Sequence, residues 1–188
     1  MKNLKIKDII IPTVALFLIC LVSTALLAFT NDITQEKIEL NAIETEKASR
    51  TLVLPNGVDY SEVTTLENGV TYCVGSDADG NETGYIFTTG AKGYGGTVGV
   101  MVGVDLEGNI TGVEILSHSE TPGLGANATK QEFKDRFIGK NGTLTVNKNS
   151  NEGQDIQAIT AATNTSKAVV AAVNTALETF AEITGGVE

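Results

Sequence analysis

Four hydroxyl side chains crowd a short segment of this chain, directly before a long amphipathic pattern. The segment covers residues 157–166, and its hydroxyls belong to Thr160, Thr163, Thr165 and Ser166. Threonine and serine are favoured at helix N-termini because a hydroxyl satisfies an unpaired backbone N–H group. Small alanines between them leave the backbone open, and a helix N-terminus is a common seat for a phosphate group. The segment therefore fits an ordinary helix start or a phosphate-carrying site.

A second unusual loop lies upstream, at residues 119–125, with the sequence Ser-Glu-Thr-Pro-Gly-Leu-Gly. Its Pro-Gly pair occupies the second and third places that a type II turn favours. Glu120 can cap this turn or hydrogen-bond a ligand. The single histidine, His118, precedes the loop, and the residues around it do not indicate a role for this side chain. The loop is expected to contain this turn whether or not it binds a ligand.

A glycine-rich stretch at residues 90–96, Gly-Ala-Lys-Gly-Tyr-Gly-Gly, is only weakly similar to a phosphate-binding loop. It lacks the GxxxxGK(S/T) spacing, which argues against nucleoside-triphosphate binding. Tyr94 either belongs to a hairpin bend or flanks a ligand. Lys167, one turn into the predicted C-terminal helix, either neutralises a phosphate or is solvated. Neither residue decides the function by itself.

The composition excludes several classes of function. The chain holds one His and two Cys, Cys20 and Cys73, without a CxxC pair, which excludes the usual His/Cys metal clusters. Any redox chemistry must then come from an organic cofactor. A formal net charge of −10 makes nucleic acid and anionic lipid headgroups unsuitable partners, because an acidic surface repels them. The role of Cys73 stays open.

The elements that must position these motifs begin with a membrane helix. Residues 9–29 are 21 residues without a charge, and at about 1.5 Å per residue such a helix spans the hydrocarbon core of a bilayer. Pro12 falls in the first turn, where a missing N–H group is harmless. Three lysines precede the run, so the positive-inside rule places residues 1–8 in the cytoplasm and the part after the helix outside the cell membrane. A cleavable signal peptide is the alternative.

The rest of the chain predicts a stalk and one domain of the α+β class. Residues 30–56 form a charged juxtamembrane stalk helix that continues from the anchor or hinges on it. Residues 57–188 form the domain. Turns rich in Gly, Asn and Asp indicate an antiparallel meander, with strands at residues 70–74, 83–89, 97–105 and 110–116. A helix at residues 130–137, a short strand at 144–146 and a helix with one apolar stripe at 165–183 follow.

These motifs together resemble the FMN-binding domain family, in which a threonine carries FMN through a phosphoester bond. The family signature is close to Asp-Ala-(Ser/Thr)-Gly-Ala-Thr-x-(Ser/Thr), and residues 159–166 fit it in register. The resemblance implies that Thr163 is the FMN acceptor and that Thr160 orients the phosphate or caps the turn. Two positions depart from the signature, since Gln157 replaces Asp and Ala161 replaces Gly. Ala161 is tolerable if its φ is below zero, because only a positive φ needs glycine.

The resemblance also implies which other residues contact the FMN. In the hydroxyl-rich segment, the expected contacts besides the two threonines of the signature are Ala161, Ala162, Thr165 and Ser166. In the upstream loop they are Glu120, Thr121, Pro122, Gly123, Leu124 and Gly125, with Leu124 against the isoalloxazine ring. Tyr94 is expected to flank the ring.

The layout of the whole chain resembles that of the G subunits of Rnf complexes, with N-terminal lysines, one membrane span, an outward domain and the two motifs. The resemblance implies an electron-carrying component of a membrane-bound, ion-translocating ferredoxin:NAD+ oxidoreductase, without a complete active site of its own. Its expected partners are other Rnf subunits and a flavin transferase for maturation. The alternatives are the C subunit of the Na+-translocating NADH:quinone reductase and a flavin-free, membrane-anchored assembly protein. The transported ion and the direction of electron flow stay open.

Overall fold

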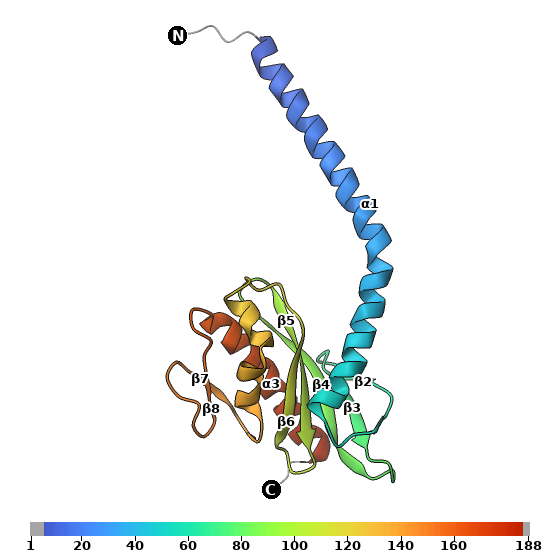
Figure 1. Cartoon of the computed structure of the whole chain (residues 1–188), viewed down its shortest axis with the longest axis vertical. Helices are drawn as coiled ribbons and strands as arrows, with labels where there is room; N and C mark the ends of the chain where they lie inside the picture. Colours follow the sequence, from blue (N-terminus) through green and yellow to red (C-terminus); the bar gives the residue numbers. More distant parts are fainter. Residues whose placement is uncertain (1–5, 186–188) are drawn as a thin grey trace. The chain divides into compact units, whose positions relative to one another are not determined.

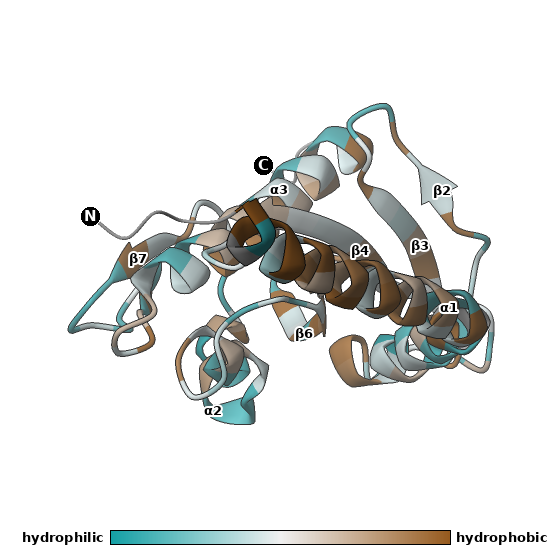
Figure 2. Ribbon diagram, turned by 90° about the horizontal axis from the view of Figure 1, so that it is seen from above, coloured by the Kyte–Doolittle hydropathy of each residue, from teal (hydrophilic) through white to brown (hydrophobic). Residues whose placement is uncertain are grey.

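Helix α1 (Ile6–Val53) is the first element of the computed structural model, which describes residues 6–185. The chain divides into two compact units at residue 44, so only the last turns of α1 belong to the second unit. The stretch Ile9–Gln35 is long and apolar enough to cross a membrane, and its most apolar window is exposed. Figure 2 shows this part of α1 as strongly hydrophobic. The predicted apolar N-terminal helix is confirmed.

Polar groups within this span satisfy themselves inside the helix. For example, the Thr24 hydroxyl donates to the carbonyl oxygen of Cys20 at 2.8 Å, as polar groups in hydrocarbon must do. The expectation that Pro12 occupies the first helical turn is wrong, because the helix already begins at Ile6. Pro12 therefore removes one backbone hydrogen bond from the interior of α1, where a proline kinks or weakens a helix.

The second unit is built on an antiparallel sheet with the order β1-β3-β4-β5-β6, in which β2 also pairs with β3. Its strands are β1 (Asp59–Tyr60), β2 (Thr64–Thr65), β3 (Thr71–Ser76), β4 (Glu82–Lys92), β5 (Thr97–Asp105) and β6 (Ile110–Ser117). The predicted meander is confirmed, and β5 has the predicted bounds. The expected loop at residues 90–96 is too long, because β4 continues to Lys92, which pairs with Thr97. Only residues 93–96 form the turn.

Helix α3 (Thr163–Thr184) covers one face of this sheet, over β4 and β5 (Figure 1). Its predicted apolar stripe is buried there, as expected of an amphipathic helix on a sheet. The ring of Phe180 packs edge-on against Tyr85, with 5.5 Å between the ring centroids. The Thr89 hydroxyl of β4 donates to the Ala172 carbonyl oxygen of α3 at 2.9 Å. Apolar packing and this buried hydrogen bond together fix the helix on the sheet.

The last turns of α1 pack on the opposite face of the sheet. They form a small buried cluster made of Val53, Leu54, Cys73, Ile86 and Met101. The Val53 carbonyl oxygen accepts a hydrogen bond from the Thr111 hydroxyl at 2.5 Å. A Cβ atom at Gly103 would lie 2.1 Å from that oxygen, so only glycine permits this approach. Burial raises the pKa of the Cys73 thiol, which therefore packs as a small apolar side chain.

Short elements connect β6 to α3. They are η1 (Gly125–Thr129), α2 (Gln131–Lys134), η2 (Asp135–Phe137), β7 (Thr145–Asn147) and β8 (Asp155–Gln157), the last two paired in parallel. The predicted helix at residues 130–137 is therefore one α-helical turn that continues as a 3-10 turn. Its Phe133 and Phe137 pack edge to face, with 5.4 Å between centroids. Strand β8 was not predicted, because three residues inside a polar stretch give no alternating pattern.

The chain enters α3 through a tight turn at residues 159–162. The Ala162 N–H group donates to the Ile159 carbonyl oxygen at 3.0 Å. Ala161 has a φ of +61°, the one positive value at a non-glycine position among residues 6–185. The condition under which alanine would be tolerable here, a negative φ, is therefore not met. The third place of this turn is left-handed, as in a type II turn, where glycine is favoured and an alanine is strained.

Replacing Ala161 by glycine should stabilise the second unit by about 1 kcal/mol, because the strain of a Cβ atom at positive φ disappears. Urea unfolding of the full-length chain in detergent measures this change. The matched control is Ala162→Gly, the next residue, whose φ is −132°. Glycine there should destabilise the unit by at least roughly 0.5 kcal/mol, since it adds freedom only to the unfolded chain. Equal effects of the two substitutions would contradict the strain at Ala161.

Candidate functional site

Three segments that are distant in the sequence meet beside one end of the sheet. They are the turn at residues 93–96, the loop at 118–125 and the start of α3 at 160–166. Together they form a pocket of about 510 Å³, a size within the roughly 300–1,000 Å³ of small-molecule sites. Its lining residues are Tyr94, Glu120, Thr121, Leu124, Gly125, Ala161, Ala162, Thr163, Asn164 and Thr165. We call this cavity the main pocket.

Four of the predicted contact residues do not line the main pocket. Gly123 and Thr160 line a neighbouring pocket of about 560 Å³ instead. Pro122 is exposed on the loop between the two. Ser166 is buried, and its hydroxyl accepts a hydrogen bond from the Ile159 N–H group at 2.9 Å. Ser166 therefore secures the turn before α3 and does not face the cavity.

Asn164 lines the main pocket and was not predicted. It occupies the variable position of the signature, so its residue type carried no signal. Gln157, which departs from the signature, lines only the neighbouring pocket. Its carbonyl oxygen accepts a hydrogen bond from Arg136 at 2.6 Å. Arg136 thereby fixes the end of β8, from which the chain turns toward α3.

The predicted type II turn in the upstream loop is confirmed. The Leu124 N–H group donates to the Thr121 carbonyl oxygen at 3.1 Å, and Gly123 at the third place has a φ of +78°. This turn leaves the Leu124 side chain 44% exposed at the edge of the main pocket. Tyr94, at the tip of the β4–β5 turn, is 76% exposed beside the same cavity. Two apolar side chains therefore border the pocket without being packed into the core.

A buried carboxylate ties the three segments together. The Glu120 side chain is only 5% exposed. One of its oxygens accepts a hydrogen bond from the Thr165 hydroxyl at 2.5 Å, and the other accepts one from the Gly95 N–H group at 2.8 Å. We call this arrangement of Gly95, Glu120 and Thr165 the Glu120 clasp. A buried carboxylate needs such donors, because burying a charge without partners is costly.

Glycines make room for the clasp. A Cβ atom at Gly125 would lie 2.5 Å from a Glu120 carboxylate oxygen and 2.6 Å from the Thr165 hydroxyl oxygen. A Cβ atom at Gly95 would lie 2.1 Å from the Ser119 carbonyl oxygen. Gly125 is thus required by the clasp, and Gly95 by the close approach of the β4–β5 turn to the backbone of Ser119. The sequence alone revealed neither contact.

The clasp keeps Glu120 ionised. Burial raises the pKa of the carboxyl group, but hydrogen bonds from Thr165 and from the Gly95 and Tyr94 backbone amides lower it, as does nearby His118. The net result is a pKa below the usual value. The carboxylate is therefore charged at neutral pH, and its oxygens serve as acceptors within the protein. The two roles predicted for Glu120 were a turn cap and a ligand contact, and its hydrogen bonds are those of a structural tie beside the pocket.

The first turn of α3 has no capping side chain, although hydroxyls surround it. Ala162 is the N-cap residue and makes no side-chain hydrogen bond to the turn, and no acidic residue lies in that turn. Within residues 6–185 the hydroxyl of Thr163 makes no hydrogen bond, and Thr163 lines the main pocket. Unpaired amides and the positive end of the helix dipole favour an anion at this point. The site therefore combines a free hydroxyl with an anion-binding helix start.

Replacing Glu120 by glutamine should destabilise the second unit by about 2 kcal/mol at neutral pH, because an amide cannot accept both hydrogen bonds. A carboxyl group with a lowered folded pKa stabilises the fold above its unfolded pKa of about 4.3, and this stabilisation is lost as the pH falls through the folded pKa. The difference between the wild type and the variant should therefore shrink when urea unfolding is repeated in acid. The control Glu132→Gln removes an exposed acid paired with Arg136 and should change stability by less than about 0.5 kcal/mol. A difference that persists unchanged in acid would contradict an ionised Glu120.

Comparisons with known proteins agree with this geometry. Residues 93–178 match the model of the FMN-binding domain, and residues 1–51 match that of the RnfG N-terminal region. The chain is 35% identical to the G subunit of the ion-translocating oxidoreductase complex of Methanosarcina acetivorans, over 92% of this chain and 94% of that protein. It is 34% identical to the G subunit of the Na(+)-translocating ferredoxin:NAD(+) oxidoreductase complex of Acetobacterium woodii, over 88% of each.

Further similarities are shorter or more distant. The G subunit of the proton-translocating ferredoxin:NAD(+) oxidoreductase complex of Clostridium ljungdahlii is 45% identical, over 57% of this chain and 59% of that protein. Among solved structures, Shewanella oneidensis NqrC superposes with a TM-score of 0.52 at 20% identity, over 65% of this chain and 66% of that one. The C subunit of the Na(+)-translocating NADH-quinone reductase of Parabacteroides distasonis gives 0.53 at 25% identity, over 63% and 65%. The structural likeness supports the α+β fold with its antiparallel sheet.

The two motifs, the pocket that they form and the apolar helix before them thus occur in one chain whose similarity to G subunits extends over nearly its whole length. Such a helix, together with relatives from ion-translocating complexes, associates the chain with a membrane. The chain belongs to the family of Rnf complex G subunits, with an FMN-binding domain behind an N-terminal membrane helix.

Proposed function

We propose that this chain carries electrons within an ion-translocating ferredoxin:NAD+ oxidoreductase, by means of one FMN bound to Thr163 through a phosphoester. Relatives named as G subunits of such complexes support this function, and the family match of residues 93–178 supports the cofactor. One observation carries the site: a threonine hydroxyl that has no hydrogen-bond partner among residues 6–185 lies on the wall of a ligand-sized pocket, at an uncapped helix start.

The start of α3 suits the phosphate of FMN. A phosphodiester on the Thr163 oxygen would keep one negative charge beside the unpaired amides of the first helical turn, where the helix dipole favours an anion. The left-handed Ala161 turns the chain just before this point. The buried Ser166 hydroxyl accepts from the Ile159 amide and donates to the Ala162 carbonyl oxygen, which holds that turn in place. Thr163 is thereby presented on a rigid element, as a covalent attachment site requires.

The main pocket suits the rest of the cofactor. FMN supplies the one-electron chemistry when bound, and the protein supplies binding and orientation. Leu124 and Tyr94 offer apolar surfaces at the pocket edge for the isoalloxazine ring. Glu120 lines the pocket but serves as a structural tie, because both of its oxygens already accept hydrogen bonds from the protein. In this assignment the clasp holds the loop and the helix start around the ring without touching the reacting atoms.

The membrane helix places this carrier beside the other subunits of the complex. We assign residues 1–8 to the cytoplasm, 9–29 to the membrane, 30–56 to a stalk and 57–188 to the FMN-binding domain outside the cell membrane. The lysines before the span and the acidic residues after it support this orientation. Maturation requires a flavin transferase that recognises the segment around Thr163. The partners in electron transfer are other Rnf subunits.

The assignment to the C subunit of the Na+-translocating NADH:quinone reductase is less favoured. The likeness to that protein rests on structures at 20% and 25% identity over about two thirds of the chain. Similarity to G subunits is higher and covers 88–92% of the chain in two relatives. A flavin-free assembly protein remains the alternative of a different class, and it predicts a colourless protein.

Replacing Thr163 by valine should abolish the covalent flavin, because valine keeps the shape of threonine but has no oxygen to esterify. Thr163→Ser should retain it. The measurement is the intact mass of the full-length chain after co-expression with a flavin transferase, where the adduct adds one FMN minus water.

Thr160→Val is the matched control, because Thr160 lines the neighbouring pocket and not the main one. It should keep the adduct, and all three variants should unfold at nearly the wild-type urea concentration. An adduct that survives in Thr163→Val would move the attachment site to another hydroxyl. A wild-type chain without any adduct would favour the flavin-free alternative.

A further inference from the structure

The charges of the second unit are segregated along the strand direction. The three segments at the main pocket and their immediate flanks carry the lysines Lys92, Lys130 and Lys167, all exposed. Among residues 6–185 none of these three forms an ion pair, since the salt bridges there involve Arg50, Lys134 and Arg136. Three acids lie within the same distance of these segments, and each has a partner: Glu120 is buried and internally bonded, Glu114 is paired with Lys134, and Asp155 accepts hydrogen bonds from Thr145 and Asn147. The exposed charges without an ion-pair partner on these segments and flanks are therefore lysines, although the chain has a net charge of −10.

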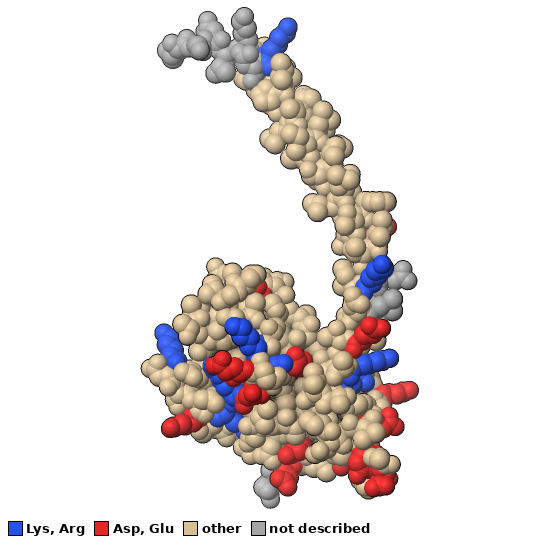
Figure 3. Space-filling view, in the orientation of Figure 1, with Lys and Arg blue, Asp and Glu red and all other residues tan. Residues whose placement is uncertain are grey.

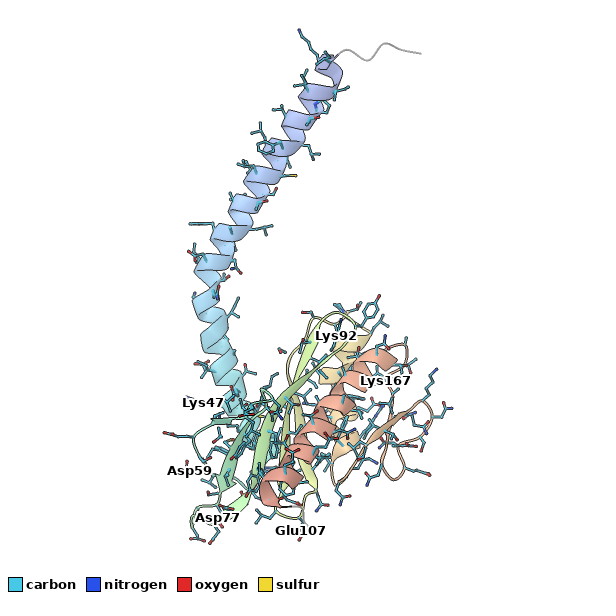
Figure 4. All side chains as sticks on the ribbon, turned by 180° about the vertical axis from the view of Figure 1, so that it is seen from behind. Lys47, Asp59, Asp77, Lys92, Glu107 and Lys167 are labelled. Carbon is cyan, nitrogen blue, oxygen red and sulfur yellow. The ribbon has the colours of Figure 1, made fainter. Side chains whose placement is uncertain are left out.

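The opposite end of the sheet carries the acids. The hairpin turns at residues 77–82 and 105–110 and the end of α3 at 178–184 contain seven Asp and Glu residues and no Lys or Arg. Figure 4 shows Lys92 and Lys167 at one end of this unit, with Asp77 and Glu107 at the other. Figure 3 shows acidic side chains along the lower edge of this unit, whereas acidic and basic side chains are mixed over the middle of the same face. The unit is thus a charge dipole whose positive end contains the pocket.

Apolar side chains lie among these lysines. Tyr94 follows Lys92 by two residues and is 76% exposed, and Leu124 is 44% exposed. Both border the main pocket. The nearby exposed acid of the neighbouring pocket, Glu132, is paired with Arg136 at 3.2 Å. An apolar centre with a charged rim is typical of protein-protein contact surfaces.

We propose that Lys92, Tyr94, Leu124, Lys130 and Lys167, here called the lysine face, form the docking surface for an electron-transfer protein with an acidic rim around its redox centre. The proposal rests on the proposed function, because docking at this face would bring the partner to the mouth of the flavin pocket. Opposite charges speed the encounter of two proteins and orient them before contact. The acidic end would be repelled by the same partner, so the dipole selects one orientation. Electron-transfer contacts are small and transient, so a few charged and apolar side chains around the pocket can form one.

The test uses the full-length chain in nanodiscs of phosphatidylcholine and an acidic plant-type ferredoxin as the probe. The double variant Lys92→Glu with Lys167→Glu should weaken ferredoxin binding about tenfold at low salt, and the difference should fade as salt screens the charges. The matched control, Lys47→Glu with Lys148→Glu, changes the net charge equally at two exposed lysines outside the face. It should weaken binding less than twofold. Basic cytochrome c as the second probe should respond to the lysine-face variant in the opposite direction.

The outcomes separate this proposal from the function on which it rests. Binding is measured with or without bound flavin, and the FMN content is read separately from the intact mass. A wild-type chain that carries no FMN would refute the proposed function. The ferredoxin-binding result would still test whether the lysine face is a docking surface. Equal effects of the two double variants, or no effect of either, would overturn the proposal. So would a lysine-face effect that occurs only when the nanodiscs contain phosphatidylglycerol, because the lysines would then face lipid.

Discussion

The rest of the site depends on one buried carboxylate. Glu120 accepts hydrogen bonds from the turn between β4 and β5 and from the first turn of α3. A charge buried in this way is tolerated only with such donors, so the three segments must meet wherever Glu120 is buried. Gly125 leaves room for this contact, and Gly95 lets the β4–β5 turn approach the Ser119 carbonyl oxygen beside it. The pocket between the segments is a consequence of this constraint, and the meander and α3 supply the rigid frame that holds it.

Two local rules of stability are broken beside the pocket. Ala161 occupies a left-handed conformation that suits glycine, and α3 begins without a capping side chain. Departures of this kind gather at functional sites, where the structure accepts strain or unpaired groups to present a residue. Here both departures serve the same residue. The turn aims the chain into α3, and the uncapped amides and the free hydroxyl of Thr163 remain available for a phosphate.

Elements with a strong periodic signal were predictable from the sequence. The apolar helix, the meander, the bounds of β5, the stripe of α3 and the Thr-Pro-Gly turn follow from local residue patterns. What the sequence could not provide depends on contacts between distant segments or on exact dihedral angles. The clasp joins residues 25 and 45 positions apart, the φ of Ala161 follows from the turn that leads from β8 into α3, and β8 is too short for a pattern. Pro12 was misplaced because charged residues before the apolar run still belong to the helix.

The central claim is that the hydroxyl of Thr163 carries FMN, and one measurement tests it most directly. The chain is purified from its native membrane, digested, and the peptide that contains residues 158–167 is sequenced by mass spectrometry. The account predicts a peptide heavier by one FMN minus water, with the added mass on Thr163. An unmodified peptide from fully active membranes, or an adduct on Thr160 or Thr165, would contradict it.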